Sequence, residues 1–536
     1  MEPRLGAVYR TELTPLSFLE RSALVFPEKT AVVYGDREMT YAEMAAAATR
    51  LARALEGSGI QAGDRVAYLC PNLPEMLIAH FGVPLLGAVL VAINTRLSAQ
   101  EIEYILNHSG ARILVADTEL ARNLAPVVDD LVTVEEVVSI DDSGTDPGFE
   151  TTPFSEFFAR GSDDPISWMV DDEERVISIN YTSGTTGRPK GVMYTHRGAY
   201  LNALGEIIHS GHSPESVYLW TLPMFHCNGW CTTWGVTGIG GTHVCLRQVD
   251  PARIWELIDQ RGVTHFNAAP TVLVGLANAP EAHPFPQPVT ITTAGAPPSP
   301  TIIETMESLG ARIVHVYGLT ETYGPHTVCE LQPGVEEMEV GERAAFLSRQ
   351  GVSYVVADPT LVVDDQGAEV PRDGETMGEV VMRGNNVMKG YFDDPEATEK
   401  AFRGGFFHSG DIAVWHPDNY IDLRDRAKDI VISGGENIST IEVERAIVSH
   451  PAVLECAVVA VPHEKWGERP KAFVVLKDGQ NVEPGEIIAH VRDLLAHFKA
   501  PDEVEMIEEL PKTSTGKIQK YVLREKEWAG YDKRVH

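Results

Sequence analysis

The sequence is short of cysteine, of positive charge and of long apolar stretches. It has six cysteines in 536 residues and no CxxC pair, which argues against a disulfide framework. No apolar run approaches the ~20 residues that a membrane-spanning helix needs. Lys and Arg number 44 against 77 Asp and Glu, a net charge of −33, so most of the surface should repel nucleic acid and anionic lipid. We therefore expect no nucleic-acid partner, no membrane span and a reducing, cytoplasmic setting.

The rest of the composition is that of a folded chain in which helical and strand-like patterns alternate. Residues 40–60 predict a helix that Thr40 opens, with Glu43 completing a capping box. DRVAYLC and ARILVAD predict buried strands, and THFNAAPTV, PVTITTAGAPP and ARIVHVYGL predict strands that run into Gly- and Pro-rich loops. Alternation of this kind favours layered α/β sheets, which bind ligands at the carboxyl ends of their strands.

A domain boundary is predicted near Arg424–Lys428. Turn-rich β sequence precedes it, and a unit of about a hundred residues, an ordinary domain size, follows it. This unit contains two helical patterns, ISTIEVERAIVSH and EIIAHVRDLLAHF, and two strand patterns, VLECAVVAV and KAFVVL. We expect a separate α+β domain at this end of the chain.

The strongest local signal for chemistry is the segment VISINYTSGTTGRPKGV. Hydroxyl side chains and glycine N–H groups can face an anion, and a lysine adds a point charge, so the segment predicts a cradle for phosphates. The GxxxxGK[ST] spacing of a Walker loop is absent. A polar surface loop is the alternative interpretation, but the density of such residues makes it a poor one. The phosphate-handling residues are Thr182, Ser183, Gly184, Thr185, Thr186, Gly187 and Lys190.

This segment resembles the phosphate loop of the acyl- and aryl-CoA synthetases, carrier-domain adenylating enzymes and luciferases, the AMP-binding adenylate-forming superfamily. TTAGAPPS, YGLTET, HSGDIAV, LRDRAKDIVISGGENIS and PKTSTGKIQK follow in the order expected of that family, and the resemblance covers essentially the whole chain. It implies an α/β fold with a large N-terminal domain, residues 1–425, of layered αβα sheets plus a distorted β-barrel. A hinge at 426–428 and a smaller mobile α+β C-terminal domain, 429–536, would complete it.

The resemblance also implies how the nucleotide is held. Tyr317 would stack on the purine ring, although a lone Tyr after a strand is otherwise usually a core residue. Glu321 and Thr182 would hold Mg²⁺, which prefers hard oxygen ligands. Outside the first segment, the implied ATP and AMP contacts are Gly295, Ala296, Pro297, Tyr317, Gly318, Thr320, Asp411 and Arg426.

The resemblance implies roles for two lysines that the residues alone do not indicate. Lys517 lies in a Thr/Ser/Gly turn, where a lysine is nearly always a surface residue. The resemblance makes it the catalytic lysine of the first step, because its charge would orient the carboxylate and stabilise the phosphates. Lys428 matches the hinge about which relatives turn the small domain.

The segment LPMFHCNGWCTTWG resembles the acyl site of fatty and aromatic acid–CoA ligases. His226 matches a catalytic position beside the carboxylate and thiol, and Trp230 one that gates or floors the acyl tunnel. The two share a face if the segment is helical, and core packing is the alternative for Trp230. The acyl pocket is thus predicted to contain His226, Trp230, Gly295 and Gly318, and the CoA site Gly434, Gly435, Arg469, Lys499 and Lys471.

These observations predict an ATP-dependent carboxylic acid–CoA ligase that uses ATP, Mg²⁺ and coenzyme A. The acid is expected to be a medium-chain fatty, short thioether or aryl, cinnamate-like acid, and relatives suggest a homodimer. An adenylating enzyme with a carrier-protein thiol, an amine or another nucleophile as acceptor would share every ATP residue, so it stays open. A non-catalytic relative is disfavoured because Lys517 and Glu321 are both present.

Overall fold

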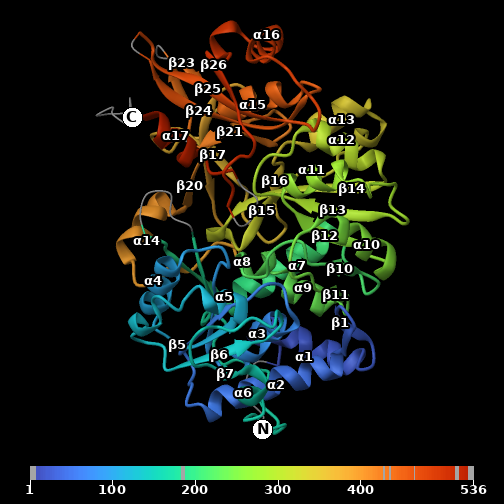
Figure 1. The fold of residues 1–536 in the computed structure, drawn as a ribbon, viewed down its shortest axis with the longest axis vertical. Coiled ribbons are helices and arrows are strands. Elements are labelled where there is room, and N and C mark those ends of the chain that lie inside the picture. The colour runs from blue at the N-terminus through green and yellow to red at the C-terminus, as the bar shows by residue number, and fades with distance from the viewer. Residues whose placement is uncertain are drawn as a thin grey trace.

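The computed structural model describes residues 8–182, 188–426, 429–433, 436–463, 465–513 and 518–528. They form a large α/β part and a smaller α+β part, which lies at the top of Figure 1. The α/β class expected from the sequence is confirmed. No helix in these ranges is long and apolar enough to cross a membrane.

Two large sheets build the first part, and both are mainly parallel. In the nine-stranded sheet, β1 and β10 to β14 run parallel, and β2, β15 and β16 are antiparallel additions at the edges. Its strands in spatial order are β16 (Val352–Ser353), β15 (Gly324–Val328), β14 (Ala311–Leu319), β13 (Val289–Thr293), β12 (His265–Ala268), β10 (Val217–Leu219), β11 (Thr242–Val244), β1 (Thr30–Tyr34) and β2 (Arg37–Thr40).

The second large sheet has eight strands and ends in an antiparallel pair that matters for the site. β8 pairs with β4 in parallel but with β9 in antiparallel register, and β9 pairs in turn with β19. In spatial order the strands are β19 (Gly390–Tyr391), β9 (Gly191–Thr195), β8 (Val176–Tyr181), β4 (Val89–Ala92), β3 (Arg65–Leu69), β5 (Ala111–Asp117), β6 (Glu136–Ile140) and β7 (Thr152–Pro153).

Helices and the main core fill the space around these sheets. α3 is buried along its whole length, which explains why its sequence shows no polar face. α2 begins at the predicted cap, where the Glu43 N–H donates to Thr40 Oγ1 at 3.2 Å. The helices of this part are α1 (Leu16–Val25), α2 (Tyr41–Gly57), α3 (Pro74–Leu85), α4 (Ala99–Ser109), α5 (Thr118–Arg122), α6 (Phe154–Phe158), α7 (His196–Ser210), α8 (Cys227–Trp230), α9 (Thr232–Gly238), α10 (Pro251–Arg261), α11 (Pro270–Asn278), α12 (Pro300–Ser308), α13 (Val340–Leu347) and α14 (Pro395–Ala401).

Where the resemblance predicts a distorted barrel, the structure has a four-stranded antiparallel sheet. Isolated bridges, Gly351 to Ile421 and Ala357 to Gly384, tie it to neighbouring segments. Its strands are β17 (Leu361–Val363), β18 (Met377–Met382), β20 (Phe407–Trp415) and β21 (Ile421–Arg426). β21 ends at the predicted hinge.

The smaller part has its own sheet and its own core. β24 and β25 form a long antiparallel ribbon, and β26 joins β25 in parallel. Its elements are β22 (Val431–Ser433), β23 (Glu436–Ile438), β24 (Val453–His463), β25 (Gly467–Leu476), β26 (Glu503–Met506), α15 (Thr440–Val448), α16 (Pro484–Leu494) and α17 (Lys520–Trp528). The division at residues 426–428 stays a prediction, and Lys428 lies outside the described residues.

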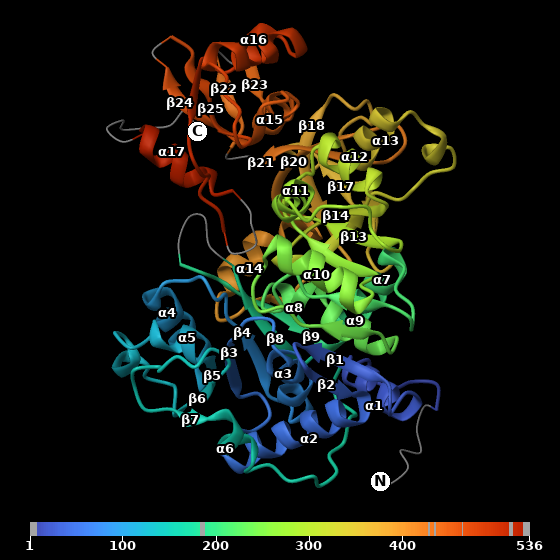
Figure 2. The same ribbon diagram turned by 45° about the vertical axis from the view of Figure 1, so that its right-hand side comes forward.

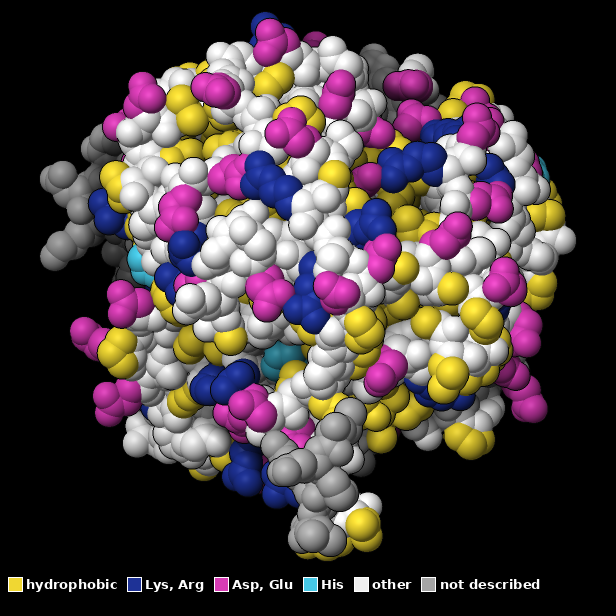
Figure 3. All heavy atoms as spheres, turned by 90° about the horizontal axis from the view of Figure 1, so that it is seen from below, with side chains coloured by type: hydrophobic (Ala, Val, Ile, Leu, Met, Phe, Trp, Pro, Cys, Tyr) yellow, Lys and Arg dark blue, Asp and Glu magenta, His cyan; other side chains and the backbone are white. Residues whose placement is uncertain are grey.

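The end of the molecule opposite the small part carries a mixed surface. Seen from below in Figure 3, Lys and Arg side chains are interspersed with Asp and Glu. The coloured side chains of this face therefore form no continuous basic surface of the kind that binds nucleic acid.

Candidate active site

The phosphate segment begins where β8 ends. The Thr182 N–H donates to the Lys190 carbonyl at 3.0 Å, so these two residues face each other across the base of the loop. The Lys190 ammonium lies 4.8 Å from the centre of the Tyr391 ring. Ser183, Gly184, Thr185, Thr186 and Gly187 lie outside the described residues, and their predicted role is untested.

Three residues predicted to hold the nucleoside meet at the end of β14. The Tyr317 hydroxyl donates to Asp411 Oδ2 at 2.8 Å, and Arg426 Nε lies 3.3 Å from Asp411 Oδ1. Asp411 and Arg426 are directly opposite each other on β20 and β21. Burial and the Asp411 charge together raise the pKa of Tyr317, so its hydroxyl keeps its proton and stays a donor. The sequence predicted the three residues but not this bond between them.

Glu321 follows Tyr317 by four residues along the chain. It has a hydrogen-bond partner, Tyr391, that the sequence did not predict. The Tyr391 hydroxyl donates to Glu321 Oε1 at 2.9 Å, and the Met388 N–H donates to the Glu321 carbonyl at 2.7 Å. Burial raises the pKa of Glu321, while the Tyr391 hydrogen bond and the Arg426 charge oppose the rise. A carboxylate held in this way suits a hard divalent cation such as Mg²⁺.

Tyr391 therefore joins the phosphate segment to the nucleotide cluster. It touches Lys190 with its ring and Glu321 with its hydroxyl. Its position follows from sheet pairing, because β19 lies beside β9 with Tyr391 opposite Val192. The local sequence at residues 390–392 gives no indication that Tyr391 contacts Glu321.

The predicted adenine-side loop follows β13. Gly295 has a φ of +92°, a left-handed conformation that favours glycine. A Cβ at Gly295 would meet no atom within 4 Å, and Gly295 and Ala296 are exposed. Because β13 lies beside β14 in parallel, the loop and Tyr317 follow the same ends of neighbouring strands.

The acyl segment does not form a right-handed helix. Five consecutive residues, Cys227 to Cys231, have positive φ angles between 52° and 63°, so α8 is a left-handed turn. His226 precedes the turn in extended backbone. A right-handed helix does not form there, so the condition on which His226 and Trp230 would share a helical face is not met.

The turn nevertheless lies against the nucleotide motif. A Cβ on Gly324 would fall 2.7 Å from Trp230 Cδ1, and a Cβ on Gly318 would fall 1.9 Å from the Gly324 carbonyl. Trp230 is only 5% exposed. At the other end of the turn, burial raises the pKa of the Cys227 thiol. Hydrogen bonds with Tyr194 and Thr320 lower this pKa, and the nearby Glu321 charge raises it. Gly324 thus leaves the room in which Trp230 packs, and Gly318 leaves room for the backbone of Gly324.

The predicted CoA contacts of the small part are engaged within it. All five N–H groups of Arg469 have acceptors: Asp502, Ser433 and the carbonyls of Phe498 and Ala500. Lys499 contacts both oxygens of Glu442 at 2.7 and 2.8 Å, and Lys471 pairs with Glu503, Glu505 and Glu527. In this arrangement these cations stabilise the small part itself.

Lys517, Gly434 and Gly435 lie outside the described residues, so their roles stay predictions. The chain just before Lys517 does reach the large part. Arg96 donates to the Thr513 carbonyl at 3.4 Å, and Figure 2 shows the segment leading to α17 descending toward α14.

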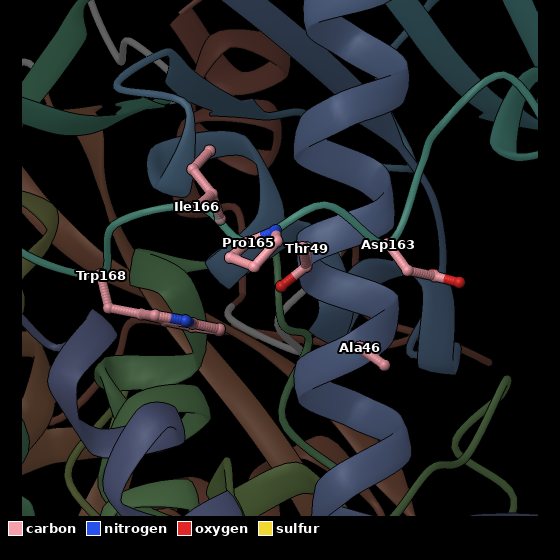
Figure 4. A pocket seen from close by; sticks show the side chains of 6 residues that line it. All are labelled: Ala46, Thr49, Asp163, Pro165, Ile166 and Trp168. Carbon is pink, nitrogen blue, oxygen red and sulfur yellow. The ribbon is translucent and has the colours of Figure 1, made fainter.

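A surface hollow lies away from the predicted active site. It lies between α2 and residues 161–175, at the end of the large part remote from the small one, and Figure 4 shows its lining. Arg50 pairs with Asp163, and Arg53 donates to the Pro165 carbonyl, which fixes the segment on the helix. No residue predicted for the active site lines it; those that do are Ala46, Thr49, Asp163, Pro165, Ile166 and Trp168.

The chain matches known proteins over nearly its full length. Residues 19–392 match the AMP-binding enzyme family and residues 442–517 the AMP-binding enzyme C-terminal domain. An acetate–CoA ligase of Humulus lupulus and a peroxisomal acetate/butyrate–CoA ligase of Arabidopsis thaliana are each 44% identical over 98% of this chain and 96% of their own.

Solved structures give the same result. The anthranilate–CoA ligase AuaEII in complex with anthranoyl-AMP superposes with a TM-score of 0.85 at 26% identity, over 97% of this chain and 98% of that one. ATP-bound MatB of Rhodopseudomonas palustris gives 0.84 at 27%, over 97% and 100%. By sequence over nearly its full length and by fold, the chain belongs to the AMP-binding enzyme family.

Proposed function

We propose that this protein is an ATP-dependent carboxylic acid–CoA ligase that acts on short aliphatic acids. The observation that carries the proposal is the joining of Tyr317, Asp411 and Arg426 into one cluster beside Glu321. Relatives named as CoA ligases match over nearly the whole chain. A chain that kept the fold but lost the chemistry would have no need to retain these paired groups.

In the first half-reaction a carboxylate oxygen of the acid attacks the α-phosphorus of ATP. The bond to the β-phosphate oxygen breaks, and pyrophosphate leaves with the electron pair, which yields acyl-AMP. Asp411 and Arg426 hold the ribose, while Lys190 and Lys517 bring positive charge to the phosphates. Positioning and charge stabilisation supply most of the rate in phosphoryl transfer of this kind. Mg²⁺, for which Glu321 and Thr182 would be the ligands, would neutralise phosphate charge.

In the second half-reaction the thiol of CoA gives up its proton and attacks the acyl carbon. AMP leaves and acyl-CoA forms. Gly434, Gly435 and His226 are proposed to lie along the path of the thiol. The small domain is proposed to turn at Lys428 between the two steps. The phosphates of CoA would then compete with Glu442 for Lys499 and with Asp502 for Arg469.

The proposed acid is shorter than the medium-chain fatty acids predicted from the sequence and differs from the thioether and aryl acids predicted with them. Trp230 is buried against Gly324 beside the nucleotide motif, and we place its indole ring at the end of the acyl pocket. Relatives are named for acetate, butyrate, 2-methylpropanoate and 4-hydroxybutyrate. A Petunia hybrida relative at 41% identity is named for trans-cinnamate, so an aryl acid is the competing outcome.

An acid panel with purified protein, ATP and CoA tests the function. We expect acyl-CoA and AMP from acetate, propanoate, butyrate or 2-methylpropanoate, and weak turnover of octanoate and cinnamate. Preferential use of octanoate or cinnamate would contradict the substrate class. AMP formation without acyl-CoA would favour a carrier-protein thiol or an amine as the acceptor. Absence of acid-dependent pyrophosphate exchange with every acid would refute the ligase itself.

Cytoplasmic location and a homodimer are part of the proposal and follow from the sequence analysis alone. The Arabidopsis thaliana relative is named as peroxisomal, so a peroxisomal location is the competing outcome. Cell fractionation decides the first point and light scattering of the purified chain the second.

A further inference from the structure

The left-handed turn at Cys227–Cys231 is the most unusual backbone feature near the site. Five successive residues have positive φ, and four of them are not glycine. Such a conformation is unfavourable for side chains with a Cβ, and for an aromatic residue it is an outlier. A strained segment of this length persists only where its surroundings hold it.

One side chain of the turn is anchored to the large eight-stranded sheet. Asn228 Oδ1 accepts from Ser178 Oγ at 2.7 Å and from Asn180 Nδ2 at 2.8 Å. All three residues are at most 2% exposed, so these hydrogen bonds are shielded from water. Ser178 and Asn180 lie on one face of β8, whose next residues lead into the phosphate segment.

Two further contacts fix the same turn. The Thr233 hydroxyl donates to the Asn228 carbonyl at 3.0 Å. A Cβ on Gly229 would come within 2.4 Å of the Trp220 ring, so only glycine fits there. Asn228 is therefore the residue that ties the turn to β8, and asparagine adopts the left-handed conformation more readily than most residues.

We propose that Asn228, held by Ser178 and Asn180, is a positioning residue that fixes Trp230 as the end wall of the acyl pocket and thereby restricts the enzyme to short acids. This inference rests on the proposed function. Because Thr182 directly follows β8, one strand sets both the end wall and the start of the phosphate segment. The distance available to the acyl chain is then fixed by the sheet and not by a flexible loop.

Without its anchor, the turn is expected to relax toward right-handed backbone and to withdraw Trp230 from Gly324. Longer chains would then fit, while the nucleotide cluster would be unaffected. One methylene in an apolar pocket discriminates by about 10–200-fold. We therefore expect the ratio of kcat/KM for hexanoate to that for butyrate to rise at least about tenfold.

Three variants of the full chain test this: Asn228→Gly, Asn228→Ala and Ser178→Ala. Asn228→Gly removes the anchor while tolerating the left-handed backbone, and Asn228→Ala removes the anchor and adds strain. Ser178→Ala removes one of the two hydrogen bonds to Asn228 Oδ1 from the strand side and leaves that of Asn180. Ser210→Ala is the matched control, because it deletes a buried hydroxyl that pairs with Thr292 Oγ1 at 2.9 Å outside this turn.

The measurement is acid-dependent pyrophosphate release with acetate, butyrate, hexanoate and octanoate. A rise in the hexanoate-to-butyrate ratio in Asn228→Gly and Ser178→Ala, with no change in Ser210→Ala, supports the inference. An unchanged ratio overturns it, whether overall activity is kept or falls equally for all acids. If Asn228→Ala does not fold, the other two variants still give the ratio. A wild-type chain inactive with every acid refutes the proposed function instead.

Discussion

At the scale of single residues, the site depends on hydroxyl groups that hold carboxylates. Tyr317 donates to Asp411 and Tyr391 to Glu321. In both pairs a carboxylate gains a donor that keeps it oriented, and a hydrogen bond to a charged group is worth about 1.5–3 kcal/mol. Two tyrosines from different sheets thus orient the two carboxylates that are proposed to bind the nucleotide and its cation.

Tyr391→Phe should impair adenylation through Glu321. Burial already raises the pKa of Glu321, and the Tyr391 hydroxyl opposes that rise. Its loss raises this pKa further, so fewer carboxylates are ionised at a given pH. We expect the acidic limb of the rate of pyrophosphate exchange to move to higher pH, and kcat/KM to fall about tenfold, the equivalent of 1.4 kcal/mol. More Mg²⁺ should partly restore the rate.

Tyr34→Phe is the control. It removes a comparable hydrogen bond, from the Tyr34 hydroxyl to Asp142 Oδ2 with a length of 2.7 Å, which lies outside the site. It should leave the pH profile in place. Equal effects of the two substitutions, or no shift of the acidic limb in Tyr391→Phe, would show that Tyr391 does not tune Glu321.

At the scale of elements, the sequence predicted those features that local patterns decide. Thr40 and Glu43 form the expected capping box, and β3, β5, β12, β13 and β14 lie where strands were expected. The hand of the turn at Cys227–Cys231 was not predictable, because Ser178, Asn180 and Trp220 determine it from distant positions. Tyr391 was missed for the same reason, since only the pairing of β19 with β9 brings it to Glu321.

Gly324 tests the packing of the turn against β15. Its φ is +99°, and a Cβ would fall 2.7 Å from Trp230, so Gly324→Ala combines backbone strain with overpacking. Gly334→Ala is the matched control, since its φ is +88° and a Cβ would meet nothing within 4 Å. Gly324→Ala should cost about 1–3 kcal/mol more in the free energy of unfolding. Equal costs in chemical denaturation would mean that Trp230 does not pack tightly there.

At the scale of the whole molecule, a buried polar cluster joins the small part to the large one. Lys520 of α17 pairs with Glu444 at 2.8 Å and donates to the Thr440 hydroxyl. Asp425 of β21 accepts from the Thr440 N–H at 2.7 Å and from its hydroxyl at 2.6 Å. The chain that carries Lys517 is thus tied, three residues further on, to the strand that carries Arg426.

Lys520→Met should therefore loosen the small part and its contact with β21. Burial lowers the pKa of Lys520, but the charges of Glu444 and Asp425 outweigh it and raise this pKa, so the lysine is charged at neutral pH. Its removal leaves the partly buried Glu444 and the buried Asp425 without this positive charge, a loss of up to about 3–5 kcal/mol. Lys526→Met, which removes an exposed cation 3.6 Å from Glu505, should cost less than about 1 kcal/mol.

The pH dependence of this loss distinguishes a charge effect from lost packing. Burial raises the pKa of Glu444 and of Asp425 even with Lys520 present, and without Lys520 both should rise further. A group whose pKa is raised by folding stabilises the fold below its unfolded pKa and loses that contribution as pH rises through its folded pKa. In Lys520→Met both carboxylates can be neutral in mild acid, so the destabilisation relative to wild type should be smaller near pH 5 than near pH 7. Urea unfolding of the full chain at these pH values measures it, and a penalty independent of pH would indicate that Lys520 contributes through packing alone.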